Sequence, residues 1–237
     1  MIRYLIPVAG VLLIASTQVE ASTYRGPHFV EPDDAGSSRD TAKDVKTQDG
    51  GAVQSMYGTL AGTGGGGFRG FGDYQDVYRI NIADPMAFKI EMGDSGLAIP
   101  DAMMFLFNEW GNPIMASDNT SSQNFNPILE NIDGQFFDEA GVYYLAITSA
   151  PSEALFEIGT DNFIPLFNLA ENPFGTVGPT DQTWDLKWTD AWSTPDYENF
   201  GTYFLNLDGV ISMPIPGPGG LAILALAGFA GRRRRRI

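Results

Sequence analysis

Residues 102–107 read Ala-Met-Met-Phe-Leu-Phe, an unbroken apolar run in a chain of 237 residues. Asn108, Gly111 and Pro113 follow it, and residues of these types end regular structure and form turns. A short apolar run bounded by turn residues is typical of a strand inside a sheet. We therefore expect residues 102–107 to form a central strand that is followed by a turn.

Alternating apolar and polar residues occur on both sides of this run. Between residues 76 and 82, apolar Val77, Ile80 and Ile82 are interleaved with polar residues, and residues 88–92 repeat the alternation. A period of two is typical of a strand with one buried face. Further short strands are expected at residues 114–116, 128–132, 142–147 and 201–207.

Helical periodicity is scarce, and only residues 163–170 suggest a helical turn. Short strands about ten residues apart, separated by glycine, proline or asparagine, predict an all-β fold, a single β-sandwich with long loops. The expected segments are a signal peptide (1–21), an irregular acidic leading segment (22–50), the β-sandwich (51–209) with an aromatic, proline-broken insertion (152–195), and a hydrophobic tail (210–237).

The body of the chain is strongly acidic. Without residues 1–21 and 214–237 it keeps 28 acidic and eight basic residues, a net charge of −20. Such a charge repels phosphates and attracts cations, which argues against binding to nucleic acid. The chain has no cysteine, so disulfide bonds and thiol catalysis are excluded.

Residues 1–21 have the three parts of an export signal. Arg3 is the positive start, residues 5–15 are apolar, and Val19-Glu20-Ala21 is a cleavage site of A-x-A type before Ser22. We expect this segment to be removed and the mature protein to lie outside the cytoplasm.

The tail predicts a temporary hold in a membrane. An apolar run at 221–230 precedes an arginine cluster, an order that leaves the cations on the cytoplasmic side. The apolar part, 215–231, is shorter than the roughly 20 residues of a full span. The residues expected to form the sorting signal are Pro216, Gly217, Pro218, Arg232, Arg233, Arg234, Arg235 and Arg236.

An export signal combined with a proline motif, a short apolar helix and an arginine cluster resembles the PEP-CTERM sorting system of Gram-negative bacteria. The family signature is Pro-Glu-Pro, and this chain has Pro216-Gly217-Pro218 in its place. The resemblance implies that an exosortase, an integral-membrane protease-transpeptidase, processes the tail and passes the protein to the cell surface. Its partners would then be this enzyme and the export machinery.

Acidic residues gather in the expected loops, where calcium ligands belong. Ca²⁺ binds six to eight oxygens at about 2.3–2.6 Å. A solvated acidic surface that keeps the protein soluble is the alternative interpretation. The candidate ligands are Glu31, Asp33 and Asp34 in the leading segment, with Asp73 and Asp76 before the first clear strand.

The order of segments also resembles the bacterial pre-peptidase C-terminal (PPC) domain, a jelly-roll-like β-sandwich of exported proteins. Over residues 31–209 the matching pieces are Glu31-Pro-Asp-Asp, Gly58-Thr-Leu, Asp76-Val-Tyr-Arg-Ile, Met104-Phe-Leu-Phe-Asn-Glu-Trp-Gly, Ser117-Asp-Asn, Ala140-Gly-Val-Tyr-Tyr-Leu-Ala-Ile and Gly201-Thr-Tyr-Phe-Leu-Asn-Leu. Some members bind calcium, and the resemblance implies Glu31, Asp33 and Asp76 as ligands. It also matches Asp118 to an acidic loop of the family.

Catalytic signals are absent from the sequence. Gly93-Asp94-Ser95-Gly96 has the letters that surround a serine nucleophile, but the chain has one histidine, His28, in the irregular leading segment. We therefore expect a hairpin turn at 93–96 and no catalytic residue.

The sequence favours a non-enzymatic protein of the cell surface or extracellular matrix, with calcium as a candidate cofactor. The first alternative is a carbohydrate-binding module that binds envelope or extracellular polysaccharide through Trp184 and Trp188. The competing interpretation of these two side chains is that they pack in the core or within the insertion. The second is a secreted hydrolase, which would need a carboxylate pair with perturbed pKa values in a cleft.

Overall fold

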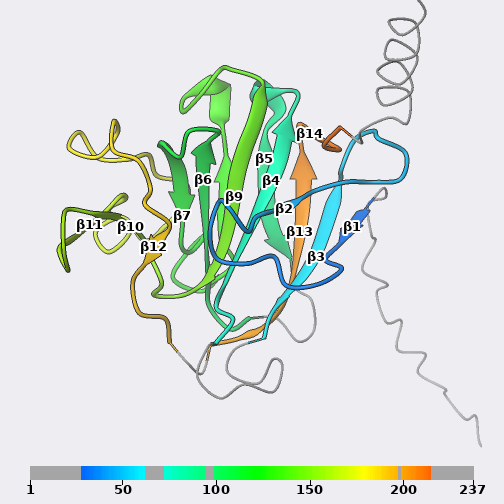
Figure 1. Ribbon diagram of the computed structural model, residues 1–237. Coiled ribbons are helices and arrows are strands. Elements are labelled where there is room, and N and C mark those ends of the chain that lie inside the picture. The colour runs from blue at the N-terminus through cyan, green and yellow to red at the C-terminus, as the bar shows by residue number, and fades with distance from the viewer. Residues whose placement is uncertain (1–27, 62–71, 94–98, 197–198, 215–237) are drawn as a thin grey trace, which may run out of the picture.

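The computed structural model of the chain describes residues 28–61, 72–93, 99–196 and 199–214. Two large β-sheets and one small sheet make up its architecture (Figure 1), and the expected all-β, sandwich-like fold is confirmed. The expected signal peptide, most of the 93–96 turn and the sorting signal lie outside these residues. Within the described part of the chain, no helix has both the length and the apolar character needed to cross a membrane.

The first large sheet has the strand order β1-β3-β13-β5-β8. The neighbours are antiparallel, except that β1 runs parallel to β3. The strand β13 lies between β3 and β5, although it comes late in the chain. The strands are β1 (His28–Val30), β3 (Ser55–Leu60), β13 (Gly201–Asp208), β5 (Lys89–Gly93) and β8 (Ile128–Glu130).

The second large sheet has the order β14-β4-β9-β6-β7, and β2 adds to β4 in a parallel pair. Its long antiparallel pairs agree with the strands expected at 76–82, 102–107 and 142–147. The strands are β14 (Val210–Ile211), β4 (Gln75–Ile82), β9 (Gly141–Ser149), β6 (Ala102–Asn108), β7 (Pro113–Ser117) and β2 (Lys43–Asp44).

The apolar run at 102–107 forms β6, which is buried on both faces. Successive side chains of a strand point to opposite faces. Met104 and Leu106 therefore belong to the main core with residues of both large sheets, whereas Phe105 and Phe107 pack in a second cluster with residues of the insertion. Two apolar layers explain why β6 has no polar face.

The insertion packs on the second large sheet and forms the second apolar layer with it. It carries the small sheet of β11 (Phe163–Pro165), β10 (Ala154–Glu157) and β12 (Ala191–Trp192). The helical turn suggested for residues 163–170 is wrong, because β11 pairs with β10 as a strand. Two short 3₁₀ helices, η1 (Pro85–Ala87) and η2 (Ile132–Gly134), complete the regular elements, and η2 takes the end of the strand expected at 128–132.

The leading segment, blue in Figure 1, joins both large sheets. Its β1 adds to the first sheet and its β2 to the second. Phe29, Ala35 and Val45 are buried in the main core. The described part of this segment is therefore not irregular throughout, because it contains two strands, and it supplies side chains to the core of the sandwich.

Candidate metal centre

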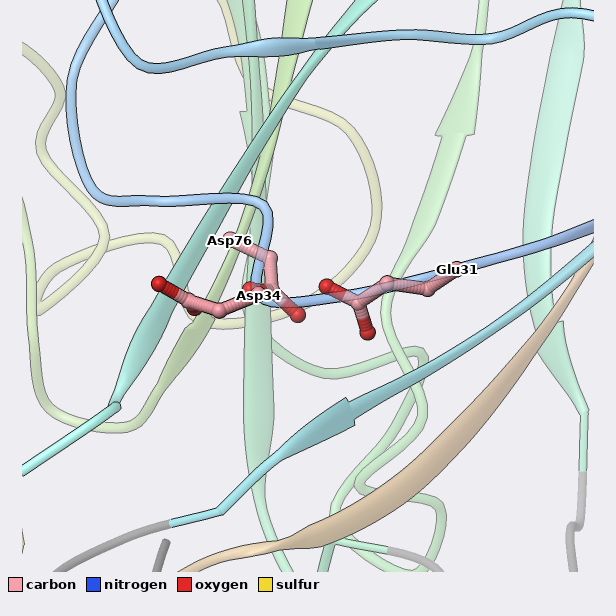
Figure 2. Close-up of side chains that lie close together, drawn as sticks. All are labelled: Glu31, Asp34 and Asp76. Atoms are coloured by element: carbon pink, nitrogen blue, oxygen red, sulfur yellow. The ribbon is translucent and has the colours of Figure 1, made fainter. Parts of the chain in front are cut away.

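Three carboxylates converge where the leading segment crosses β4 (Figure 2). Glu31 follows β1 directly, Asp34 lies in the loop that continues from it, and Asp76 is on β4. One carboxylate oxygen from each of the three lies within 4.8 Å of the others. Two oxygens that bind the same Ca²⁺ at about 2.3–2.6 Å are at most about 5 Å apart, so this spacing fits a single ion.

Asp76 points into the sandwich because of its place in the alternation of β4. It has the same parity as Tyr78, Ile80 and Ile82, whose side chains belong to the main core. The Asp76 residue is 0 % exposed. The parity was visible in the sequence, and it distinguishes Asp76 from the acidic residues of the surface.

One oxygen of Asp76 has a partner and the other does not. Oδ2 accepts a hydrogen bond of 2.5 Å from the Tyr203 hydroxyl. Oδ1 is buried and accepts none from the described residues. A buried acceptor without a donor costs about 1–3 kcal/mol, and more when it is charged. The Oδ1 atom of Asp76 is therefore available to a cation. On a solvated acidic surface this oxygen would be hydrated, and it would not be buried without a partner.

Glu31 is fixed in the same way. Its Oε2 accepts a 2.9 Å hydrogen bond from the Thr59 N–H of β3, and Oε1 is buried with no hydrogen bond to the described residues. Burial raises the pKa of Glu31 to about 7, although the Thr59 N–H acts in the opposite direction. Two of the three carboxylates thus have one oxygen held by the protein and one left over.

The electrostatics of the group favour either a proton or a cation. Burial, together with the charges of Glu31 and Asp73, raises the pKa of Asp76 to about 9. Asp73 lies nearby, with Oδ2 accepting a 2.8 Å hydrogen bond from the Ala61 N–H, and burial raises its pKa to about 6. Without a cation, the folded protein keeps a proton on Asp76 at neutral pH.

Two predicted metal ligands lie elsewhere. The exposed side chain of Asp33 forms an ion pair with Lys43 Nζ at 2.8 Å. Asp34, and not Asp33, lies beside Glu31 and Asp76. Asp118 lies after β7 and lines a separate cavity. The PPC resemblance therefore named two of the three converging residues, and Asp73 is a neighbour of the group.

The tryptophans of the insertion have different surroundings. Trp188 is 0 % exposed and stacks on Phe107, with ring centroids 4.7 Å apart. Trp184 is 64 % exposed. A buried ring cannot stack on a sugar, so the pair cannot act together as the predicted carbohydrate platform.

No protein-family model, curated protein or solved structure matches this chain. The functional argument therefore rests on the chemistry of the described residues and on the sequence patterns at the two ends. All three converging side chains offer oxygen only, and hard cations such as Ca²⁺ prefer oxygen ligands.

Proposed function

We propose that this chain is an exported, non-enzymatic cell-surface protein, a jelly-roll-like β-sandwich whose leading segment is fastened by Ca²⁺. Glu31, Asp34 and Asp76 would hold the ion, with further oxygens from backbone carbonyls or water. The ion would neutralise part of a charge that otherwise opposes the approach of the leading segment to β4.

The observation that carries this proposal is the buried, unpartnered Oδ1 of Asp76 beside two other carboxylates. None of the three forms an ion pair with a lysine or arginine in the described part of the chain, and Lys43 instead pairs with Asp33. Metal binding would require these groups to lose their protons, so the ion would take the place of the proton on Asp76.

Binding at this point would stabilise the contact between the leading segment and both sheets. A ligand that binds only the folded state adds about 2.7 kcal/mol at a free concentration 100 times its Kd. Extracellular fluids and surfaces supply calcium more readily than the cytoplasm does, which agrees with the export signal expected at residues 1–21. The sorting tail adds the expected route to the surface.

The calcium part is tested by thermal unfolding of the full chain in EGTA and in excess CaCl₂. We expect a higher Tm with calcium in the wild type and in Asp33→Asn, and little change in Asp34→Asn and Asp76→Asn. Asp33→Asn is a matched control because it removes the same charge one residue away. A wild-type Tm that is independent of calcium, with no binding by calorimetry, would refute the proposed site.

The export part has a separate test. The protein is recovered from the envelope and medium of its native host, and its intact mass is measured. This mass should correspond to a chain that begins at Ser22 and ends near residues 216–220. A mass that retains Arg232 to Arg236 would refute processing of the tail and leave the calcium proposal untouched.

A further inference from the structure

A second acidic feature is a cavity of about 530 Å³ between the start of β6, the loop after β7 and the insertion. Its volume is within the range of small-molecule sites, about 300–1,000 Å³. None of the described residues that line it is lysine, arginine or histidine. The lining combines four carboxylates with apolar side chains: Asp101, Asp118, Glu153 and Asp196, with Met103 and Leu169.

The backbone that carries these carboxylates is held in place by side-chain hydrogen bonds. Asn199 Oδ1 accepts a 3.1 Å hydrogen bond from the Asp101 N–H, and Asn199 Nδ2 donates to the Ala150 carbonyl at 3.2 Å. Ser193 Oγ accepts a 2.8 Å hydrogen bond from the Glu153 N–H. The backbone at Asp101 and Glu153 is therefore held by side chains that neighbour the cavity.

Two of these carboxylates have an oxygen with no donor. Oδ1 of Asp101 and Oδ1 of Asp118 are buried atoms that accept no hydrogen bond from the described residues. Burial raises the pKa of Asp118 to about 6, and the charges of Asp101 and Glu153 act in the same direction. The described lining thus has no positive charge, and a ligand would have to bring both the charge and the donors for these two oxygens.

A single metal ion fits this cavity poorly. In the described part of the chain, Glu31, Asp34 and Asp76 are the set of three acidic groups that meet within 4.8 Å, and the cavity carboxylates form no such set. Charges spread over a wider space suit a ligand whose cationic groups are spaced along a chain. Met103 and Leu169 offer apolar surface to the methylene groups between them.

We propose that this cavity binds an organic polycation, an alkyl chain with two or more ammonium groups. The ammonium groups donate hydrogen bonds to Asp101, Asp118 and Glu153, and the alkyl chain contacts the apolar lining. Charge-assisted hydrogen bonds of this kind are the stronger ones in proteins. This site is independent of the proposed calcium site.

Calorimetry of the full chain with spermidine, in EGTA, tests the proposal. The wild type and Asp181→Asn, which removes an exposed carboxylate outside the cavity lining, should bind with the same Kd. We expect Asp118→Asn and Glu153→Gln to bind about tenfold more weakly or worse. Butylamine should bind more weakly than spermidine, and 1,4-butanediol should not bind.

Asp118→Asn should fold, because burial already disfavours the charged form of this side chain, and its Tm without ligand checks this. Equal loss of affinity in Asp118→Asn and Asp181→Asn would mean general attraction to an acidic surface and would overturn the site. Absence of spermidine binding, or binding of a neutral oligosaccharide in its place, would overturn the ligand class. Retained spermidine binding in Asp76→Asn would separate this result from the calcium result.

Discussion

Tyr203 of β13 donates a 2.5 Å hydrogen bond to Asp76 Oδ2 of β4, and this bond joins the two large sheets at the candidate metal centre. Both residues are 0 % exposed. The Tyr203 hydroxyl also lies 2.5 Å from the Tyr78 hydroxyl. Tyr203 therefore decides which oxygen of Asp76 is held by the protein and which is left for a ligand.

Replacing Tyr203 with phenylalanine should destabilise the protein and weaken calcium binding. The ring remains, but Asp76 Oδ2 loses its donor, which costs about 1–3 kcal/mol in the free energy of unfolding. Urea unfolding and calcium calorimetry measure the two effects. Tyr57→Phe, at a half-buried position of β3, is the control. Wild-type stability and wild-type calcium affinity in Tyr203→Phe would contradict the assigned hydrogen bond.

Gly58 leaves the space that the Tyr203 hydroxyl occupies. A Cβ at position 58 would overlap the hydroxyl oxygen and Cζ of Tyr203. Gly58→Ala should therefore lower the free energy of unfolding by about 1–3 kcal/mol. The cost should be smaller in a Tyr203→Phe background, which a double-mutant cycle measures. Additive effects would indicate that the alanine is accommodated by another shift.

Without calcium, the protein should become less stable as pH rises from about 4 to 9. Unfolded Asp76 loses its proton near its ordinary pKa of 3.8, whereas folded Asp76 keeps it up to a pKa of about 9. The free energy of unfolding then falls by about 1.4 kcal/mol per pH unit for each proton that only the folded state retains. Glu31, with a pKa of about 7, acts in the same direction over a narrower window.

Urea unfolding at several pH values, in EGTA and in excess CaCl₂, measures this dependence. Asp76→Asn should reduce the slope in EGTA, and calcium should reduce it in the wild type, because the bound ion removes the protons from the folded state. Stability that rises with pH in EGTA would show that Asp76 is ionised in the folded protein.

The two tryptophans of the insertion should differ sharply on mutation. Trp188 is fully buried and its Nε1 donates a 3.1 Å hydrogen bond to the Ala191 carbonyl, so Trp188→Ala should cost about 3–5 kcal/mol of stability. Trp184→Ala, at an exposed position, should change stability by no more than about 0.5 kcal/mol. Thermal unfolding of both variants is the measurement, and similar Tm losses would contradict the burial of Trp188.

The strands could be predicted where neighbouring side chains alone decide the structure. The alternation in β4 and the apolar run in β6 located both strands, because burial on one or two faces leaves a direct mark on the residue pattern. The leading segment left no such mark. Its buried residues Phe29, Ala35 and Val45 are spaced irregularly in the sequence, and they pack in a core made by residues of both large sheets.

The candidate metal centre was partly predictable for the same reason. The composition of the loops indicated acidic ligands, and Asp76 was among them. The choice between Asp33 and Asp34 depends on which side chain turns toward β4, and Asp33 is drawn away by Lys43. No local pattern specifies that pairing, and the orphaned Oδ1 of Asp76 depends on Tyr203, which is distant in the sequence.

The position of β13 also constrains when this protein can fold. β13 pairs with β3 on one side and β5 on the other, so the first sheet stays divided until residues 201–208 are available. Pairings over such sequence separations form slowly, because a long loop must close before any contact rewards it. A chain that stops before residue 201 lacks the strand that unites β3 with β5. The sandwich can therefore be completed only after residue 208 has been synthesised.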